Sequence, residues 1–210
     1  MEQNSHSIVI LANGSYPTHS IPLDFLSKNN TILCCDGSID RLLESSIKPK
    51  FILGDLDSIS KKSLKRYSDI IIEESNQNYN DLYKCLTWCK KNKYSDITIL
   101  GASGNREDHT IGNIFLLFEF SNDLNIKMIT DEGVFTLINA NATFKSYKNQ
   151  PVSIFCIDKS IRLITKNLKY PINNTSLVNL FSGTLNQSNS NKFNIDISHG
   201  SILVFQKHKN

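Results

Sequence analysis

Short apolar runs alternate with segments of helical periodicity through the first two-thirds of this chain, and the helical periodicity then stops. The apolar runs are mostly continuous rather than interrupted by polar residues, which is typical of strands that are covered on both faces. A chain that repeats strand, helix, strand forms a mostly parallel, doubly wound α/β sheet. We therefore predict strands at Ser7–Leu11, Thr31–Cys34, Phe51–Leu53, Ile70–Glu73, Ile97–Leu100 and Ile126–Thr130.

Two segments between these strands are predicted to be helices, Asp81–Lys91 and Thr110–Phe120. In the first, apolar residues recur at positions i, i+3, i+4 and i+7, which is the spacing of one helix face. Its start is marked by Asn80, a residue type that caps helices, and an acidic residue follows in the positively polarised first turn. The apolar stripe consists of Leu82, Cys85, Leu86 and Cys89.

The pattern of the sequence changes after about Leu137. Short strand-like runs follow, separated by loops rich in Asn, Ser and Gly, which is typical of a small antiparallel β-sandwich. We therefore expect two domains, an α/β domain of residues 1–139 and a smaller all-β sandwich of residues 140–210. The strands predicted for the sandwich are Val152–Ile157, Ile161–Ile164, Leu177–Leu180, Phe193–Ile197 and Ser201–Phe205.

The composition excludes several classes of protein. With 40% hydrophobic and 20% charged residues, the chain is not collagen-like, coiled-coil or disordered. Lys and Arg (23) exceed Asp and Glu (20) by only three, so the charge balance does not indicate a nucleic-acid partner. No apolar stretch approaches the ~18 residues of a membrane span. Five cysteines without a Cys-x-x-Cys pair are typical of buried thiols. We expect a cytoplasmic protein that binds neither nucleic acid nor a membrane.

Polar and acidic residues follow several predicted strands at the points where the strands end. The second strand leads into Asp36-Gly37, the third into Gly54-Asp55-Leu56-Asp57, and the fifth into the segment from Gly101 to His109. Because ligands bind at the carboxyl ends of the strands in an open parallel sheet, we expect these segments to meet. Glycines let backbone N–H groups approach a phosphate, and one or two carboxylates are the usual protein ligands of Mg²⁺.

These residues also have purely structural interpretations. Asp55 and Asp57 could form a turn, but two carboxylates that flank one residue repel each other unless a cation lies between them. Arg106 and Asp108 could be a surface ion pair of little energetic consequence, or they could face a phosphate. The same choice between a structural and a functional role is open for Asp36, Asp81 and His109.

No common phosphate-binding motif accounts for this set of residues. The chain has no Gly-x-x-x-x-Gly-Lys-Ser/Thr segment, and it lacks the protein-kinase signature set. Several carboxylates, one arginine and glycine turns at one edge of a sheet predict metal-assisted phosphoryl chemistry on a nucleotide.

A set of ordered motifs extends over nearly the whole chain. They are Ala12-Asn13-Gly14, Asp36-Gly37, Lys48 to Ser58, Asn76 to Asp81 leading into Lys84-Cys85-Leu86, Gly101 to His109 with Asn113, and Leu168-Lys169-Tyr170-Pro171-Ile172-Asn173. Each motif alone is weak. In this order, they resemble the thiamine pyrophosphokinase (thiamine diphosphokinase) family.

That resemblance implies an enzyme that uses ATP and Mg²⁺. The primary hydroxyl of thiamine would attack the β-phosphorus of ATP, giving thiamine diphosphate and AMP. It also implies a homodimer whose thiamine site lies between the first domain of one subunit and the sandwich of the other. By motif position, the resemblance implies three sets of site residues. The catalytic and metal-binding carboxylates are Asp55, Asp57 and Asp81, and the thiamine-binding residues are Gln77, Thr184 and Asn186. The ATP-binding residues are Asn13, Gly14, Asp36, Gly37, Gly101, Arg106, Asp108 and His109.

The sequence departs from the family pattern at several positions. They are Asn78 and Asn80, where Asp and Thr are usual, and Ser38, Asn105 and Asn167, where Gly is usual. A further departure is Thr184-Leu185-Asn186-Gln187, where Thr-Ser-Asn-Glu is usual and Ser188-Asn189 offers a second register. Two other functions therefore stay open. One is a phosphatase of the haloacid-dehalogenase type with Asp55 as nucleophile, although its Asp-x-Asp motif normally follows the first strand. The other is a nucleotide-binding relative without turnover.

Overall fold

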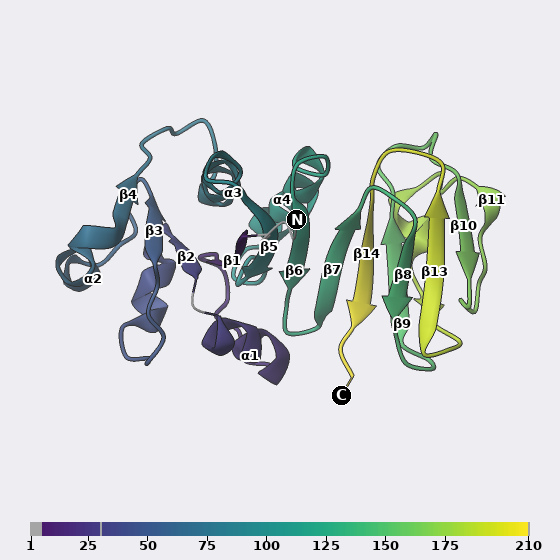
Figure 1. Cartoon of the computed structure of the whole chain (residues 1–210), viewed down its shortest axis with the longest axis horizontal. Helices are drawn as coiled ribbons and strands as arrows, with labels where there is room; N and C mark the ends of the chain where they lie inside the picture. Colours follow the sequence, from purple (N-terminus) through teal and green to yellow (C-terminus); the bar gives the residue numbers. More distant parts are fainter. Residues whose placement is uncertain (1–5, 30, 210) are drawn as a thin grey trace, which may run out of the picture. The chain divides into compact units, whose positions relative to one another are not determined.

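The computed structural model describes residues 6–29 and 31–209, and the chain divides into two compact units, Met1–Asp131 and Glu132–Asn210 (Figure 1). The division falls one strand earlier than the expected boundary between residues 139 and 140. Strand β7 (Gly133–Ile138) causes this difference, because it pairs antiparallel along its whole length with β14 (Ile202–Lys207), a strand of the second unit.

The first unit contains one sheet whose strands follow the order β6-β5-β1-β2-β3-β4. Every neighbouring pair within this set is parallel. The strands lie close to the predicted apolar runs and are largely buried, as expected for strands covered on both faces. Their bounds are β1 His6–Leu11, β2 Ile32–Cys35, β3 Phe51–Gly54, β4 Ile71–Glu73, β5 Tyr94–Leu100 and β6 Asn125–Ile129.

The helices of the first unit include both of the predicted ones. Helix α3 has the predicted bounds, Asp81–Lys91, and the side chain of Asn80 accepts a hydrogen bond of 2.8 Å from the N–H of Tyr83. Helix α4 begins earlier than predicted, at Glu107, and ends at Glu119. The sequence did not predict α1 (Ser20–Lys28), α2 (Lys61–Arg66), or the 3₁₀ helices η1 (Asp36–Leu42) and η2 (Ser68–Ile70). No helix in the described part of the chain has the length and apolar character needed to cross a bilayer.

The order of the strands creates a crevice beside β1. The chain first adds β2, β3 and β4 on one side of β1, and it then returns to place β5 and β6 on the other side. At such a reversal the loops that leave neighbouring strands separate, and ligands bind at the carboxyl ends of those strands. The loops that follow β1, β2, β3 and β5 are therefore brought to one edge of the sheet.

The second unit consists of two antiparallel sheets with one shared core. The sheet orders are β12-β9-β14-β7 and β11-β10-β13-β8, and the core includes Phe144, Ile154 and Phe193. One predicted strand, Leu177–Leu180, is wrong: the segment is a loop that leads into the 3₁₀ helix η3 (Leu180–Gly183). The remaining strands are β8 Ala142–Lys145, β9 Pro151–Phe155, β10 Leu163–Lys166, β11 Asn173–Thr175, β12 Asn186–Gln187 and β13 Lys192–Ile197.

Candidate active site

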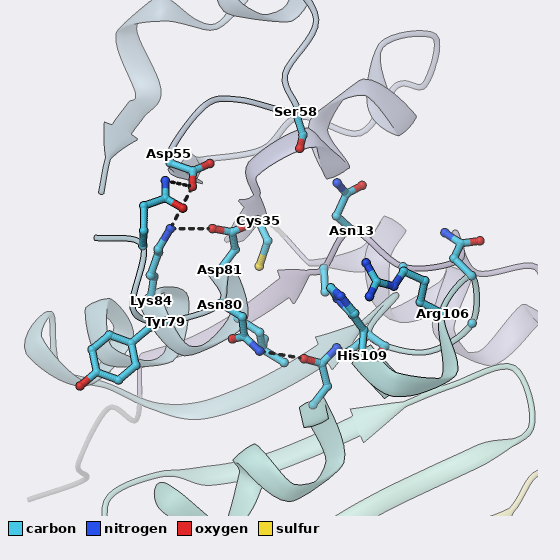
Figure 2. A pocket seen from close by; sticks show the side chains of 18 residues that line it. Asn13, Cys35, Asp55, Ser58, Tyr79, Asn80, Asp81, Lys84, Arg106 and His109 are labelled. Atoms are coloured by element: carbon cyan, nitrogen blue, oxygen red, sulfur yellow. Dashed lines mark hydrogen bonds and ion pairs between the residues drawn. The ribbon is translucent and has the colours of Figure 1, made fainter. Parts of the chain in front are cut away.

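A cavity of about 390 Å³ opens at the carboxyl ends of the strands of the first unit (Figure 2). Its lining comes from the loops after β1, β3 and β5, the end of β2, the loop before α3, and the N-terminal parts of α3 and α4. The lining includes Asn13, Gly14, Cys35, Asp55, Ser58, Gln77, Tyr79, Asn80, Asp81, Lys84, Arg106, His109 and Asn113. Seven of the residues predicted from sequence to bind ATP, metal or thiamine thus meet here, as the strand order requires.

Three carboxylates beside the cavity form what we call the acidic group: Asp36, Asp55 and Asp57. One oxygen of each lies within 4.8 Å of one oxygen of each of the others. Asp36 is buried, Asp55 is half-buried and Asp57 is exposed, so the group extends from the interior to the surface. Carboxylate oxygens gathered at this spacing can coordinate a hard divalent cation such as Mg²⁺.

Asp36 holds the loop that carries the other two members of the acidic group. Its two carboxylate oxygens accept hydrogen bonds from the N–H groups of Leu56 (3.0 Å) and Ser58 (3.1 Å). Burial raises the pKa of Asp36, although the hydrogen bonds from Ser58 oppose that shift. The neighbouring Gly37 has no room for a side chain, because an added Cβ would lie 2.7 Å from the carbonyl oxygen of Ser58. Asp36 and Gly37 do not line the cavity, but they fix the position of the loop that carries Asp55 and Asp57.

Asp81, which the sequence predicts to be a metal ligand, lines the same cavity at the start of α3. Asp81 Oδ1 lies 3.0 Å from Nζ of Lys84, one turn further along α3. The same ammonium lies 3.5 Å from Asp55 Oδ2. The buried ammonium of Lys84 therefore lies between two carboxylates that the sequence predicts to bind a metal ion.

Lys84 is the main residue of this site that sequence reasoning missed. Burial acts to lower the pKa of its ammonium, but Asp81 and Asp55 outweigh burial and raise that pKa. For Asp55, burial acts to raise the pKa, but the hydrogen bond from Gln77 and the charge of Lys84 outweigh it and lower that pKa. The sequence did contain one signal for the burial of Lys84. In the predicted helix it stands three residues after Asp81 and next to Cys85 of the apolar stripe.

Gln77 and Asn80, which come from the loop before α3, each contact a partner inside the cavity. Gln77 Nε2 donates a hydrogen bond of 2.8 Å to Asp55 Oδ2. Asn80 caps α3 and also approaches Asn113 on α4, at 3.4 Å. Asn is a good helix cap, so the replacement of the usual Thr at position 80 preserves the start of α3.

Glycine turns shape the opposite side of the cavity. Gly14 lies against the loop after β5, where an added Cβ would come within 2.5 Å of the carbonyl oxygen of Gly101. Gly101 and Gly104 have positive φ angles of 65° and 75°. Asn105 follows with φ 61°, a conformation that Asn adopts more readily than most residues. The turn therefore keeps its shape although Asn replaces the family's usual second Gly.

Arg106, Asp108 and His109 form what we call the arginine rim. The guanidinium of Arg106 donates two hydrogen bonds to Asp108, of 3.1 and 2.6 Å. Arg106 lowers the pKa of Asp108 to about 2. Arg106 and His109 line the cavity on the side opposite Lys84, whereas Asp108 does not line it (Figure 2). Both members of the ion pair are exposed, so the pair itself contributes little to stability.

Thr184 and Asn186 lie in the second unit. Asn186 is buried, and its amide both donates to Tyr170 O (2.7 Å) and accepts from Tyr170 N (3.0 Å). The Thr184 hydroxyl donates to Phe181 O at 2.8 Å. In this structure, therefore, both side chains hold neighbouring backbone in place.

Two family models match the chain in order. Residues 23–130 match "Thiamin pyrophosphokinase, catalytic domain", and residues 133–205 match "Thiamin pyrophosphokinase, substrate-binding domain". The chain belongs to the thiamin pyrophosphokinase family. The boundary between the two matches agrees with the division between the two units at Asp131 and Glu132.

Individual relatives agree with this assignment. "Thiamine pyrophosphokinase 1" of Oryza sativa is 27% identical over 188 residues, which cover 75% of this chain and 70% of the relative. "Thiamine pyrophosphokinase" of Bacillus subtilis is 25% identical over 178 residues, which cover 80% of this chain and 82% of the relative. The crystal structure of the Bacillus subtilis enzyme shares the fold, with a TM-score of 0.83 at 20% identity over 97% of this chain and all of that chain. The Candida albicans structure gives a TM-score of 0.81 at 20% identity, covering 98% of this chain and 90% of that chain.

Proposed function

We propose that this protein transfers the diphosphate group of ATP to the primary hydroxyl of thiamine, giving thiamine diphosphate and AMP. The observation that supports this most strongly is that both family models match in order, over nearly the whole chain. The cavity agrees with such a reaction, because carboxylates lie on one side and an arginine on the other. The family assignment does not favour the phosphatase alternative, and β3, rather than the first strand, precedes Asp55.

The acidic group fits a magnesium ion. Its three carboxylates come from two loops, and their oxygens lie within 4.8 Å of one another. Asp55, Asp57 and Asp81 would hold the ion, with Asp36 behind the loop that carries Asp55 and Asp57. A bound magnesium ion supplies positive charge that neutralises phosphate oxygens and orients them. With Asp81, four carboxylates lie near one buried lysine, so this side of the cavity is acidic without the ion.

The chain's own residues would position the nucleotide. Arg106 presents a guanidinium, whose fork matches two phosphate oxygens, and Asp108 fixes its orientation. Gly14 and Gly104 line the cavity without a side chain, so the nucleotide could approach the backbone closely at these turns. The oxygen of the thiamine hydroxyl would then form a bond to the β-phosphorus, and the bond from that phosphorus to the bridging oxygen of AMP would break. The hydroxyl proton would pass to a carboxylate, Asp57 or Asp81. Positioning and charge neutralisation account for most of the acceleration in such transfers.

We further propose that the protein is a homodimer in which residues of the second unit, among them Thr184 and Asn186, complete the thiamine site of a partner copy. In the same segment, the apolar residues Phe181 and Leu185 are 73% and 86% exposed. Apolar side chains this exposed support burial of the segment against a partner copy. In a mixing experiment, an Asp57→Asn protomer and a Thr184/Asn186 double variant should together recover activity that neither has alone. Verified mixed dimers without recovery would contradict the shared site.

We also propose the architecture of the first unit and the cellular location of the protein. The first unit is a doubly wound domain, because right-handed crossovers on either side of β1 put α1 and α4 on opposite faces of the sheet. The protein works in the cytoplasm, which its five free, buried cysteines support.

The assay that tests the proposed function uses purified protein with ATP, magnesium chloride and thiamine. Equal amounts of AMP and thiamine diphosphate should form, and removal of the metal with EDTA should abolish both. ADP or inorganic phosphate without thiamine diphosphate would favour a phosphatase. Nucleotide binding without any product would favour the relative without turnover.

A further inference from the structure

Two cysteine side chains meet beside the cavity although they are 50 residues apart in sequence. Sγ of Cys35, the last residue of β2, lies 3.1 Å from Sγ of Cys85 in α3. Both thiols are free and buried. A disulfide bond is about 2.05 Å long, so these sulfur atoms need to approach by only about 1 Å to form one. Neither thiol has a part in the proposed transfer.

The two thiols differ in their access to the cavity. Cys35 lines it and is labelled among its side chains in Figure 2, whereas Cys85 does not line it. Burial raises the pKa of Cys85 and that of Cys89, one turn further along α3. Cys85 and Cys89 therefore remain protonated thiols, which are poor nucleophiles. A small oxidant that enters the cavity would react with Cys35 first.

The contact between the two cysteines joins elements that carry carboxylates of the site. Cys35 immediately precedes Asp36, whose oxygens hold the backbone of the loop of the acidic group. Cys85 lies one helical turn after Asp81, the first residue of α3. A bond between the sulfur atoms would draw the end of β2 and α3 together, and both carboxylates would move with their backbones. Catalysis by positioned groups is sensitive to shifts of about 1 Å.

We propose that hydrogen peroxide converts Cys35 and Cys85 into a reversible disulfide that switches the enzyme off. The inference rests on the proposed function for its effect on turnover, but formation of the disulfide does not depend on that function. In a reducing compartment such a bond would be transient, as is usual for disulfides that sense oxidants there.

The chemistry has two steps. The Cys35 sulfur attacks one peroxide oxygen, the O–O bond breaks, and the departing hydroxide leaves as water with the thiol proton, giving a sulfenic acid. The Cys85 sulfur then attacks the Cys35 sulfur, the S–O bond breaks, and the departing hydroxide takes the Cys85 proton to form water. Both cysteines are thereby oxidised and the peroxide is reduced to water. Dithiothreitol reverses the change, because its two thiols take over the disulfide.

The test treats the purified, reduced protein with hydrogen peroxide without ATP or thiamine. Peptide mapping should find Cys35 linked to Cys85, with a mass about 2 Da below that of the two thiol peptides together. The oxidised protein should bind Mn²⁺ more weakly in calorimetry and should lose most of its turnover, measured as AMP formation. Dithiothreitol should restore both. Cysteines that only fill the core would give no linked peptide.

Cys85→Ala is the informative variant, and Cys89→Ala is its matched control. Both cysteines are fully buried on the same helix, and neither lines the cavity. Cys85→Ala should keep its turnover in a peroxide treatment that inactivates the unmodified protein. Cys89→Ala should form the linked peptide and lose turnover as the unmodified protein does. Equal loss of turnover in both variants would contradict the role of Cys85.

Two results with the unmodified protein would overturn the proposal, and neither needs a variant that folds. One is the absence of the linked peptide after peroxide treatment. The other is a linked protein with unchanged Mn²⁺ affinity and full turnover, because the bond would then not act as a switch. If the reduced protein forms no AMP, the proposed function fails, whereas the linked peptide and the Mn²⁺ affinity still decide this proposal.

Discussion

The two sides of the cavity are built by different means. On the acidic side, two contacts join distant parts of the chain: Asp36 accepts from the N–H of Leu56, and Lys84 lies 3.5 Å from Asp55. Asp36 and Lys84 are buried and Asp55 is half-buried. The arginine rim depends on a pair only two residues apart, with Arg106 65% and Asp108 64% exposed in their side chains. The acidic side is therefore fixed by the fold before any ligand binds, whereas the rim is a local arrangement that solvent can screen. Substitutions on the acidic side should have the larger effects.

The largest effect is expected for Asp57→Asn. The change removes one charge from the acidic group but keeps the shape of the side chain, so the fold should persist while the site loses a metal ligand. We expect turnover to fall by about 10³-fold or more, measured as AMP formation. Asp69→Asn, at an exposed carboxylate of the same unit, is the control and should retain full activity. Equal activity of both variants would remove Asp57 from the metal site.

A smaller effect is expected on the other side of the cavity. Arg106→Gln removes the guanidinium and leaves Asp108 without its partner. The Michaelis constant for ATP should rise by roughly 10- to 100-fold, with little change in the melting temperature, because the pair is exposed. Arg66→Gln, outside the cavity, provides the comparison. If the two arginine variants have the same ATP dependence, the arginine rim does not face the nucleotide.

Gly37→Ala tests whether the loop of the acidic group is held by close packing. An added Cβ would lie 2.7 Å from Ser58 O and 3.0 Å from Asn13 Nδ2, so the loop must shift. We expect a loss of about 1–3 kcal/mol in the free energy of unfolding and a several-fold loss of turnover. Gly112→Ala, in α4, meets no atom within 4 Å and should instead stabilise the protein by about 0.5–1 kcal/mol. Denaturant unfolding of both variants measures the difference, and equal stabilities would contradict the packing argument.

The smallest expected effect is that of the Asp108 carboxyl on the pH dependence of activity. Since Arg106 lowers the pKa of Asp108 to about 2, below its usual value, the ion pair is complete above about pH 4 and is lost only as the pH falls through about 2. Asp108 should therefore cause no inflection in activity between about pH 6 and 9. Carbon-detected NMR titration should find the carboxyl pKa of Asp108 near 2 and a higher value in Arg106→Gln. An unchanged pKa in that variant would show that the pair does not form in solution.

Local signals in the sequence predicted much of the first unit. The apolar stripe and Asn80 gave helix α3 its correct bounds, because a cap and a periodic face are both properties of a few neighbouring residues. The strand-end principle also predicted that Asp55 and Arg106 lie close together, and the family resemblance added Gln77; all three line one cavity. Strand β5 begins earlier than predicted, at Tyr94, because pairing with β1 extends it through polar residues that carry no apolar signal.

The errors arose where distant contacts decide the outcome. Strand β7 belongs to the second unit because it pairs with β14, at the far end of the chain, and no residue within β7 indicates that partner. The apolar run from Leu177 suggested a strand, but Leu177 is buried while Val178 and Leu180 are exposed, which is not the pattern of a paired strand. Lys84 was missed for the same reason, since its burial depends on Asp55, a residue of another loop.

The most direct test of the account is a crystal structure with magnesium and α,β-methylene-ATP, an analogue that cannot be split at the bond this reaction breaks. We predict a magnesium ion bound by Asp55, Asp57 and Asp81, with the triphosphate between that ion and Arg106. A triphosphate bound away from the acidic group, or an ion that contacts none of its carboxylates, would contradict this prediction.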